Sequence, residues 1–209
     1  RHVIIDKNTS VWIAQRNGRT KDGNDLTQTG LLKMLNMSGG KDFKKSFSEL
    51  NIVPLTISFE YEPCDDLKVQ ELYLSSLHTK YVKAPGEDLN SILTGIKQFK
   101  GKIHVAFGKP IKEELIEIDK ANNENDKIKN LVTYIDKQIY QNYKLNPVNY
   151  IAYDLLNQTN VFENNYSKTE KEQFISYMNS KISGLKGETE VLNHLFISLY
   201  ANPVINKLK

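Results

Sequence analysis

The pattern of hydrophobic residues changes character near residue 121, and this change limits the folds open to the chain. Before it, short runs of β-branched and aromatic residues alternate with helical patterns, as in proteins that pack helices on a sheet. Beyond it, apolar residues recur at helical spacing. We therefore predict an α/β domain over residues 1–120 and an all-helical C-terminal domain over residues 121–209.

Three segments of the first domain are predicted to be strands: residues 11–14, 52–61 and 102–110. Because proline cannot donate to a β ladder, Pro54 restricts the second strand to an edge, or marks the point where it starts. The predicted helices open at residues 25–28, span 43–50, open at 63–66 and span 89–99.

The C-terminal region carries two specific helix-start signals. Asn146 and Pro147 combine a cap with a proline at the first helical position. Ser167 and Glu170 form a capping-box pattern. Eight of the 11 tyrosines lie between Tyr134 and the C-terminus, which leaves a membrane-facing or partner-binding surface open as an alternative to packing against the first domain.

Composition and motifs exclude several classes of protein. The net charge of +3 is too small to indicate a nucleic-acid partner. A single cysteine, Cys64, rules out an internal disulfide framework and is typical of a reducing compartment. The sequence has no apolar run of ~18 residues, no signal-peptide organisation, no zinc-ligand spacing and no nucleotide-binding fingerprint. We expect neither a metal nor a bound cofactor.

A cluster of cations follows the first predicted strand. The apolar residues 11–14 lead directly into Arg16, Arg19 and Lys21 on a turn-prone segment that ends at Asp22 and Gly23. The guanidinium group offers a planar fork of donors that matches a phosphate, and lysine adds a mobile point charge. The loop therefore indicates an anion site; a solvated turn is the alternative.

Residues 13–23, Ile-Ala-Gln-Arg-Asn-Gly-Arg-Thr-Lys-Asp-Gly, resemble the third motif of the glycerolipid acyltransferases, which act on glycerol phosphate and lysophosphatidate. In that family a strand leads into Phe-Pro-Glu-Gly-Thr-Arg-Ser. Residues 52–57 are similar to the fourth motif, a hydrophobic strand with a central proline. Residues 103–111 resemble the following strand, which ends in Gly-Lys-Pro. The three segments occur in the family's order and together span roughly residues 1–112.

The resemblance implies a mixed sheet with flanking helices and a peripheral enzyme at the cytoplasmic face of the inner membrane. Such an enzyme transfers an acyl group from acyl-CoA or acyl carrier protein to a hydroxyl of glycerol-3-phosphate or lysophosphatidate. Arg19 aligns with the motif arginine. The residues implied to bind the acceptor phosphate are Arg16, Gly18, Arg19 and Lys21, supported by Thr20, Asp22, Gly23 and Pro54.

The sequence departs from the family at two places. Arg16 occupies the column of the motif glutamate, and the catalytic His-x4-Asp motif is not found. His2 and Asp6 are separated by only three residues and lie too close to the third motif, so we interpret them as structural. We expect the catalytic dyad in a missing N-terminal portion, which would leave this chain alone inactive.

Two other functions remain open: a non-catalytic phosphate-binding protein on the same scaffold, and a helical interaction module whose partner surface lies in residues 121–209. Lys83 and Lys109 are interpreted as solvated, with a phosphate or carrier groove as the alternative. The remaining chemistry-bearing residues are interpreted as structural: Cys64, His78, His104 and His194.

Overall fold

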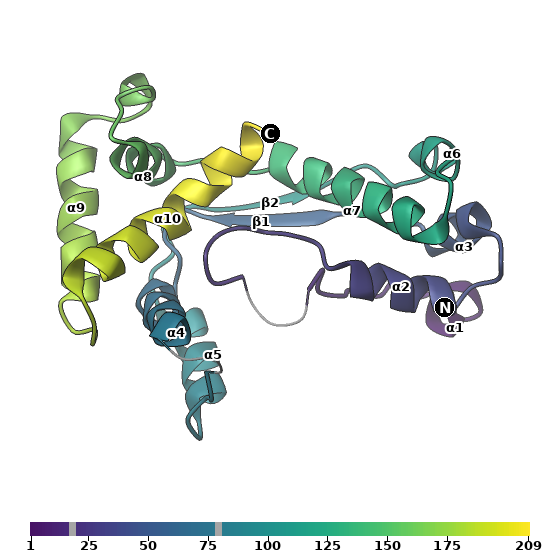
Figure 1. The fold of residues 1–209 in the computed structure, drawn as a ribbon, viewed down its shortest axis with the longest axis horizontal. Coiled ribbons are helices and arrows are strands. Elements are labelled where there is room, and N and C mark those ends of the chain that lie inside the picture. The colour runs from purple at the N-terminus through teal and green to yellow at the C-terminus, as the bar shows by residue number, and fades with distance from the viewer. Residues whose placement is uncertain (17–19, 78–80) are drawn as a thin grey trace. The chain divides into compact units, whose positions relative to one another are not determined.

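A computed structural model describes residues 1–16, 20–77 and 81–209, and it is mostly helical (Figure 1). Helices account for 57% of the described residues, which form one sheet of only two antiparallel strands. These strands are β1 (Leu55–Phe59) and β2 (Ile103–Phe107). The predicted α/β class, with an acyltransferase-type mixed sheet and flanking helices, is therefore wrong.

The missing strand is the one predicted at residues 11–14. This segment has no regular structure, and its Trp12 side chain is 75% exposed. A strand is stable only beside a partner that satisfies its backbone hydrogen bonds. The described residues offer this segment no such partner, so its β-branched residues alone do not make it a strand.

The chain divides into two compact units, each assembled from separate segments. The first comprises the described residues of 1–19, 25–56 and 105–142; the second comprises those of 20–24, 57–104 and 143–209. Each unit draws on both sides of residue 120, and a domain boundary at that residue stays a prediction.

The first unit is a small helical assembly around an aliphatic and aromatic core. Asp42 caps helix α3 (Phe43–Leu50) by accepting a hydrogen bond from the Lys45 amide at 2.9 Å. Its helices are α1 (His2–Ile5), α2 (Thr29–Met37), α3 (Phe43–Leu50), α6 (Glu114–Ile118) and α7 (Glu124–Gln141). Its buried core includes Leu32, Phe47, Ile111, Leu115, Ile128 and Leu131.

The second unit is organised around its longest helix, α10 (Thr189–Lys207), which packs along α8 (Pro147–Asn157) and α4 (Asp65–Leu77). The other helices are α5 (Glu87–Lys97), a 3-10 turn (Glu163–Asn165) and α9 (Lys168–Ile182). Its core includes Val69, Ile151, Phe174, Phe196, Leu199 and Ala201.

Both predicted helix-start signals are confirmed. Pro147 is the first residue of α8, and the Asn146 amide donates to Oδ1 of Asn149 at 2.9 Å. The Ser167 hydroxyl caps α9 by accepting from the Glu170 amide, while the Glu170 carboxylate accepts from the Ser167 amide at 2.7 Å.

Candidate functional site

The cationic loop begins in the first unit, where Arg16 is half-buried. The carbonyl of Gln15 accepts from the Gln28 amide at 3.0 Å, which fixes the backbone just before the arginine. Within the described residues, the Arg16 Nε atom is buried without a hydrogen-bond partner. A buried donor is normally satisfied, and none of the described residues satisfies this one. Gly18 and Arg19 lie outside the described residues.

Lys21 belongs to the second unit, where its ammonium group forms an ion pair with Glu71 of α4. The Glu71 side chain is only 7% exposed. A buried carboxylate needs a compensating charge, so Lys21 already has a structural role. Its assignment to phosphate binding stays a prediction, and a bound phosphate would compete with Glu71 for the ammonium group.

Replacing Lys21 with methionine is expected to lower the free energy of unfolding by about 1–2 kcal/mol. Glu71 would lose the only charged partner that the described residues of the second unit give it. Urea denaturation followed by circular dichroism measures the change. The double variant Lys21→Met/Glu71→Gln serves as the control and should recover part of the loss, since no buried charge is then left unpaired. Equal stability of Lys21→Met and the parent chain would contradict this role.

The end of the loop is attached to α10. The Asp22 carboxylate accepts from the Asn24 amide at 3.0 Å, and the Asp22 carbonyl accepts from Nδ2 of Asn202 at 2.6 Å. Gly23 has a φ of +73°, and a Cβ at this position would lie 2.2 Å from the Leu199 carbonyl oxygen. Thr20, at the start of this stretch, is half-buried. Only glycine fits at the closest approach to α10.

Residues 52–56 and 105–111 of the two other motif segments lie side by side in the first unit. Pro54 is buried and immediately precedes β1, which confirms the prediction of a strand start. Its carbonyl accepts from the Gly108 amide at 2.8 Å, and the Ile52 carbonyl accepts from the Ile111 amide at 2.9 Å. Segments more than 50 residues apart in the sequence are thus hydrogen-bonded along their backbones.

Gln138 of α7 holds the Gly-Lys-Pro segment in place. Its Oε1 accepts from the Lys109 amide at 2.7 Å, and its Nε2 donates to the Lys109 carbonyl at 3.2 Å. A Cβ on Gly108 would lie 2.3 Å from the same Oε1. The Lys109 side chain is exposed. Sequence reasoning missed Gln138, although it continues the buried spacing of Leu131 and Ile135 along α7.

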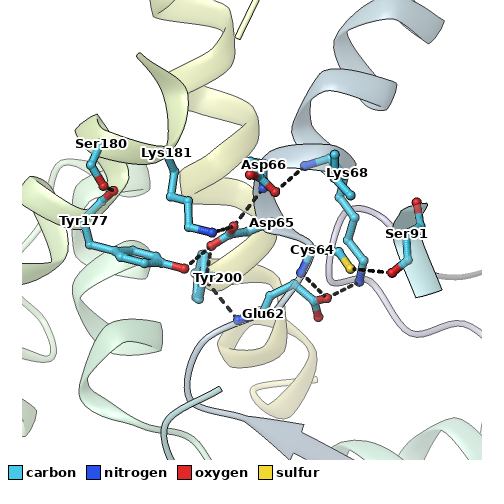
Figure 2. Close-up of polar contacts among 11 residues, drawn as sticks. Glu62, Cys64, Asp65, Asp66, Lys68, Ser91, Tyr177, Ser180, Lys181 and Tyr200 are labelled. Carbon is cyan, nitrogen blue, oxygen red and sulfur yellow. Dashed lines mark hydrogen bonds and ion pairs between the residues drawn. The ribbon is translucent and has the colours of Figure 1, made fainter. Parts of the chain in front are cut away.

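A second polar cluster lies inside the second unit, around the fully buried Asp65 in the first turn of α4 (Figure 2). One carboxylate oxygen, Oδ2, accepts from the Tyr177 hydroxyl at 2.6 Å and the Tyr200 hydroxyl at 2.8 Å. The other, Oδ1, lies 3.0 Å from the Lys181 ammonium group. The Tyr200 oxygen in turn accepts from the Glu62 amide at 3.0 Å.

The electrostatics of this cluster favour a structural role. Burial, reinforced by the Asp65 charge, raises the pKa of both Tyr177 and Tyr200 well above the usual value for tyrosine. Both phenols therefore stay protonated and donate to the carboxylate. A cation and two hydroxyl donors surround the buried Asp65 carboxylate and compensate for its loss of hydration. Sequence reasoning missed this cluster, because an aspartate in a first helical turn is ordinary on a solvated helix.

The remaining candidate residues show no catalytic arrangement in the described part of the chain. Nδ1 of His2 lies 2.5 Å from Oδ2 of Asp6 on the surface of α1, with both side chains more than half exposed. His104 and His194 are exposed, and His78 lies outside the described residues. The buried Cys64 donates to the Ser91 carbonyl at 3.4 Å.

No group of three or more His, Cys, Asp or Glu residues able to hold a metal occurs in the ranges described. Within the same ranges, each helix is too short or too polar to cross a bilayer. Comparison with protein-family models, curated proteins and solved structures gave no match.

Proposed function

We propose that this chain takes part in acyl transfer from a thioester of coenzyme A or acyl carrier protein to a hydroxyl of glycerol-3-phosphate or lysophosphatidate. The observation that supports the proposal is the pairing of two motif segments through the Pro54 carbonyl and the Gly108 amide at 2.8 Å. Segments that resemble the motifs of one family and follow the family's order support a common site more strongly when they also lie next to each other. The proposal includes a peripheral position at the cytoplasmic face of the membrane, and neither a metal nor a bound cofactor.

The chemistry assigns one role to this chain and another to residues outside it. A hydroxyl is a weak nucleophile, so a histidine oriented by a carboxylate must take its proton. The exposed His2 and Asp6 offer no enclosed site for that step, and the proposal assigns it to a His-x4-Asp motif outside residues 1–209. The acceptor would be positioned by its phosphate, held by Arg19 together with Arg16.

A non-catalytic anion-binding protein is the second candidate. Arg16 stands where the family has a glutamate, which adds a cation to the loop and removes a carboxylate. This substitution favours anion binding over the family's chemistry. Both candidates require the loop to bind phosphate, and they differ in whether acyl transfer follows.

Replacing Arg19 with alanine is expected to weaken binding of glycerol-3-phosphate about 10–100-fold, the loss expected for one charge-assisted contact. Isothermal titration calorimetry with residues 1–209 measures it without any catalytic base. The affinity of Arg19→Lys for glycerol-3-phosphate should fall between those of the parent chain and Arg19→Ala, because lysine offers a point charge in place of the planar guanidinium group. Lys33→Ala, an exposed lysine on α2, is the matched control and should bind like the parent chain.

Three outcomes test the role of Arg19 and the two candidate functions. An Arg19→Ala chain that binds glycerol-3-phosphate as tightly as the parent contradicts the role of Arg19. A parent chain that binds neither glycerol-3-phosphate nor lysophosphatidate contradicts both candidate functions. Phosphate binding without acyl transfer, in a protein that also carries a His-x4-Asp motif, supports the non-catalytic alternative.

A further inference from the structure

Helix α5 packs against the rest of the second unit through its polar and small residues. Figure 2 shows Ser91 beside Cys64, and the Ser91 carbonyl accepts from the Cys64 thiol at 3.4 Å. A Cβ at Gly95, one turn further along, would lie 3.6 Å from the same sulfur. Ser91 is the one buried residue of this helix. The inward face of α5 is therefore the face that lacks large apolar side chains.

The opposite face carries a stripe of exposed aliphatic side chains, at positions i, i+3, i+4 and i+7 of one helical face. We call this set the α5 stripe: Leu89, Ile92, Leu93 and Ile96, which are 61%, 59%, 43% and 70% exposed. Phe99, just beyond the helix, is 73% exposed. An amphipathic helix normally turns its apolar face inward, and α5 does the reverse.

The charges at the carboxyl end of the stripe are positive, whereas the first turn of α5 carries Glu87 and Asp88, and Asp88 forms an ion pair with Lys83. From Leu89 to Ile103 the sequence has three lysines and no aspartate or glutamate. Lys97 lies in the last turn of α5, and the Lys102 side chain is 78% exposed, with its nearest carboxylate, Glu60, at 3.9 Å. The Lys100 ammonium group sits at the carboxyl end of α5, donating to the Ile96 carbonyl at 3.1 Å. An aliphatic stripe with cations at its end is typical of helices that lie in the surface of an anionic bilayer.

A second copy of the chain fits the α5 stripe poorly. A helix of 11 residues is only about 16 Å long, so two facing stripes would bury well under the roughly 1,200 Å² of a stable interface. A parallel pairing would also bring the lysines of the two copies together. A bilayer surface has neither restriction.

We propose that the α5 stripe inserts into the interfacial layer of an anionic phospholipid bilayer, while Lys97 and Lys102 contact the lipid headgroups. The inference rests on the peripheral membrane position included in the proposed function, but not on acyl transfer. It identifies the helix that makes the contact and the lipid charge that it prefers.

Co-sedimentation of residues 1–209 with vesicles tests the stripe. The parent chain should bind vesicles of phosphatidylcholine and phosphatidylglycerol, and more weakly those of phosphatidylcholine alone. Ile92→Ser/Ile96→Ser should reduce binding at least about tenfold. Met37→Ser/Val161→Ser, two exposed apolar residues elsewhere, is the matched control and should bind like the parent. The replaced side chains are exposed, so thermal melting should show that each variant folds.

The variant Lys97→Gln/Lys102→Gln tests the charge. It should bind the anionic vesicles about tenfold less and lose part of the salt dependence, with little change on phosphatidylcholine. Undiminished binding by Ile92→Ser/Ile96→Ser, or no vesicle binding by the parent chain, overturns the proposal. So does a dimer in solution that the same double substitution abolishes, because the stripe would then be covered by a second copy.

Failure here is distinguishable from failure of the proposed function. Arg19→Ala leaves α5 unchanged and should bind vesicles like the parent, whereas the Ile92→Ser/Ile96→Ser variant should bind soluble glycerol-3-phosphate like the parent. A chain that binds the phosphate but no vesicle overturns this inference and the peripheral membrane position, and leaves phosphate binding and acyl transfer standing. A chain that binds vesicles but no phosphate overturns the function alone.

Discussion

Replacing Asp65 with alanine will lower the free energy of unfolding by about 3–5 kcal/mol, the usual effect of removing one partner from a buried charge pair. The Lys181 ammonium group would lose its carboxylate partner at 3.0 Å, and the hydroxyls of Tyr177 and Tyr200 would lose their acceptor. These donors would then lack their acceptor in a largely desolvated environment. Urea denaturation of residues 1–209, followed by circular dichroism, measures the loss.

The neighbouring Asp66 provides the matched control. Its carboxylate accepts from the Leu67 amide at 2.8 Å in the same helical turn, but it is only half-buried. Asp66→Ala should therefore cost about 0.5–1.5 kcal/mol, as for one ordinary hydrogen bond. Asp65→Asn should fall between the two alanine variants, because the amide keeps one acceptor oxygen. A loss in Asp65→Ala no larger than in Asp66→Ala would show that the cluster does not hold the second unit together.

Replacing Gly23 with alanine will destabilise the attachment of the cationic loop to α10. The added Cβ would lie 2.2 Å from the Leu199 carbonyl oxygen, and backbone atoms cannot yield as a flexible side chain can. Such overpacking costs about 1–3 kcal/mol. The left-handed backbone, with a φ of +73°, adds about 1–2 kcal/mol for any residue with a Cβ. Thermal and urea denaturation measure the sum.

Gly30→Ala makes the same chemical change where space is open. A Cβ at Gly30 meets no atom within 4 Å, and this residue lies within helix α2. Alanine should stabilise that helix by about 0.5–1 kcal/mol. The two substitutions are thus predicted to change the free energy of unfolding in opposite directions. If Gly23→Ala proves as stable as Gly30→Ala, the loop is not seated against α10 as described.

The sequence predicts local structure well where the signal is itself local. The α3 helix spans the predicted residues 43–50, and Pro147 and Ser167 mark helix starts through groups a few residues away. The segment 11–14 has strand-forming residues but lacks a neighbouring strand among the described residues. Strand formation depends on a partner distant in the chain, which composition does not reveal.

The same limit applies to the candidate site. Pro54 and the Gly-Lys-Pro segment were identified from their own residues, and the structure brings them together. The partner of Lys21 is Glu71, 50 residues away, and no local pattern indicates that pairing. Gln138 was missed for the same reason, since an uncharged side chain within a helix marks no site until its partner is known.

The backbone of Lys109 forms two hydrogen bonds with one side chain, that of Gln138: its amide donates to Oε1, and its carbonyl accepts from Nε2. This primary amide presents the same donor and acceptor that the backbone of a neighbouring strand would present. The glutamine is therefore a one-residue substitute for a third strand. A ribbon of two strands is marginal by itself and tends to fray at its ends. Here the side chain of Gln138, from helix α7, holds the backbone just beyond the end of β2.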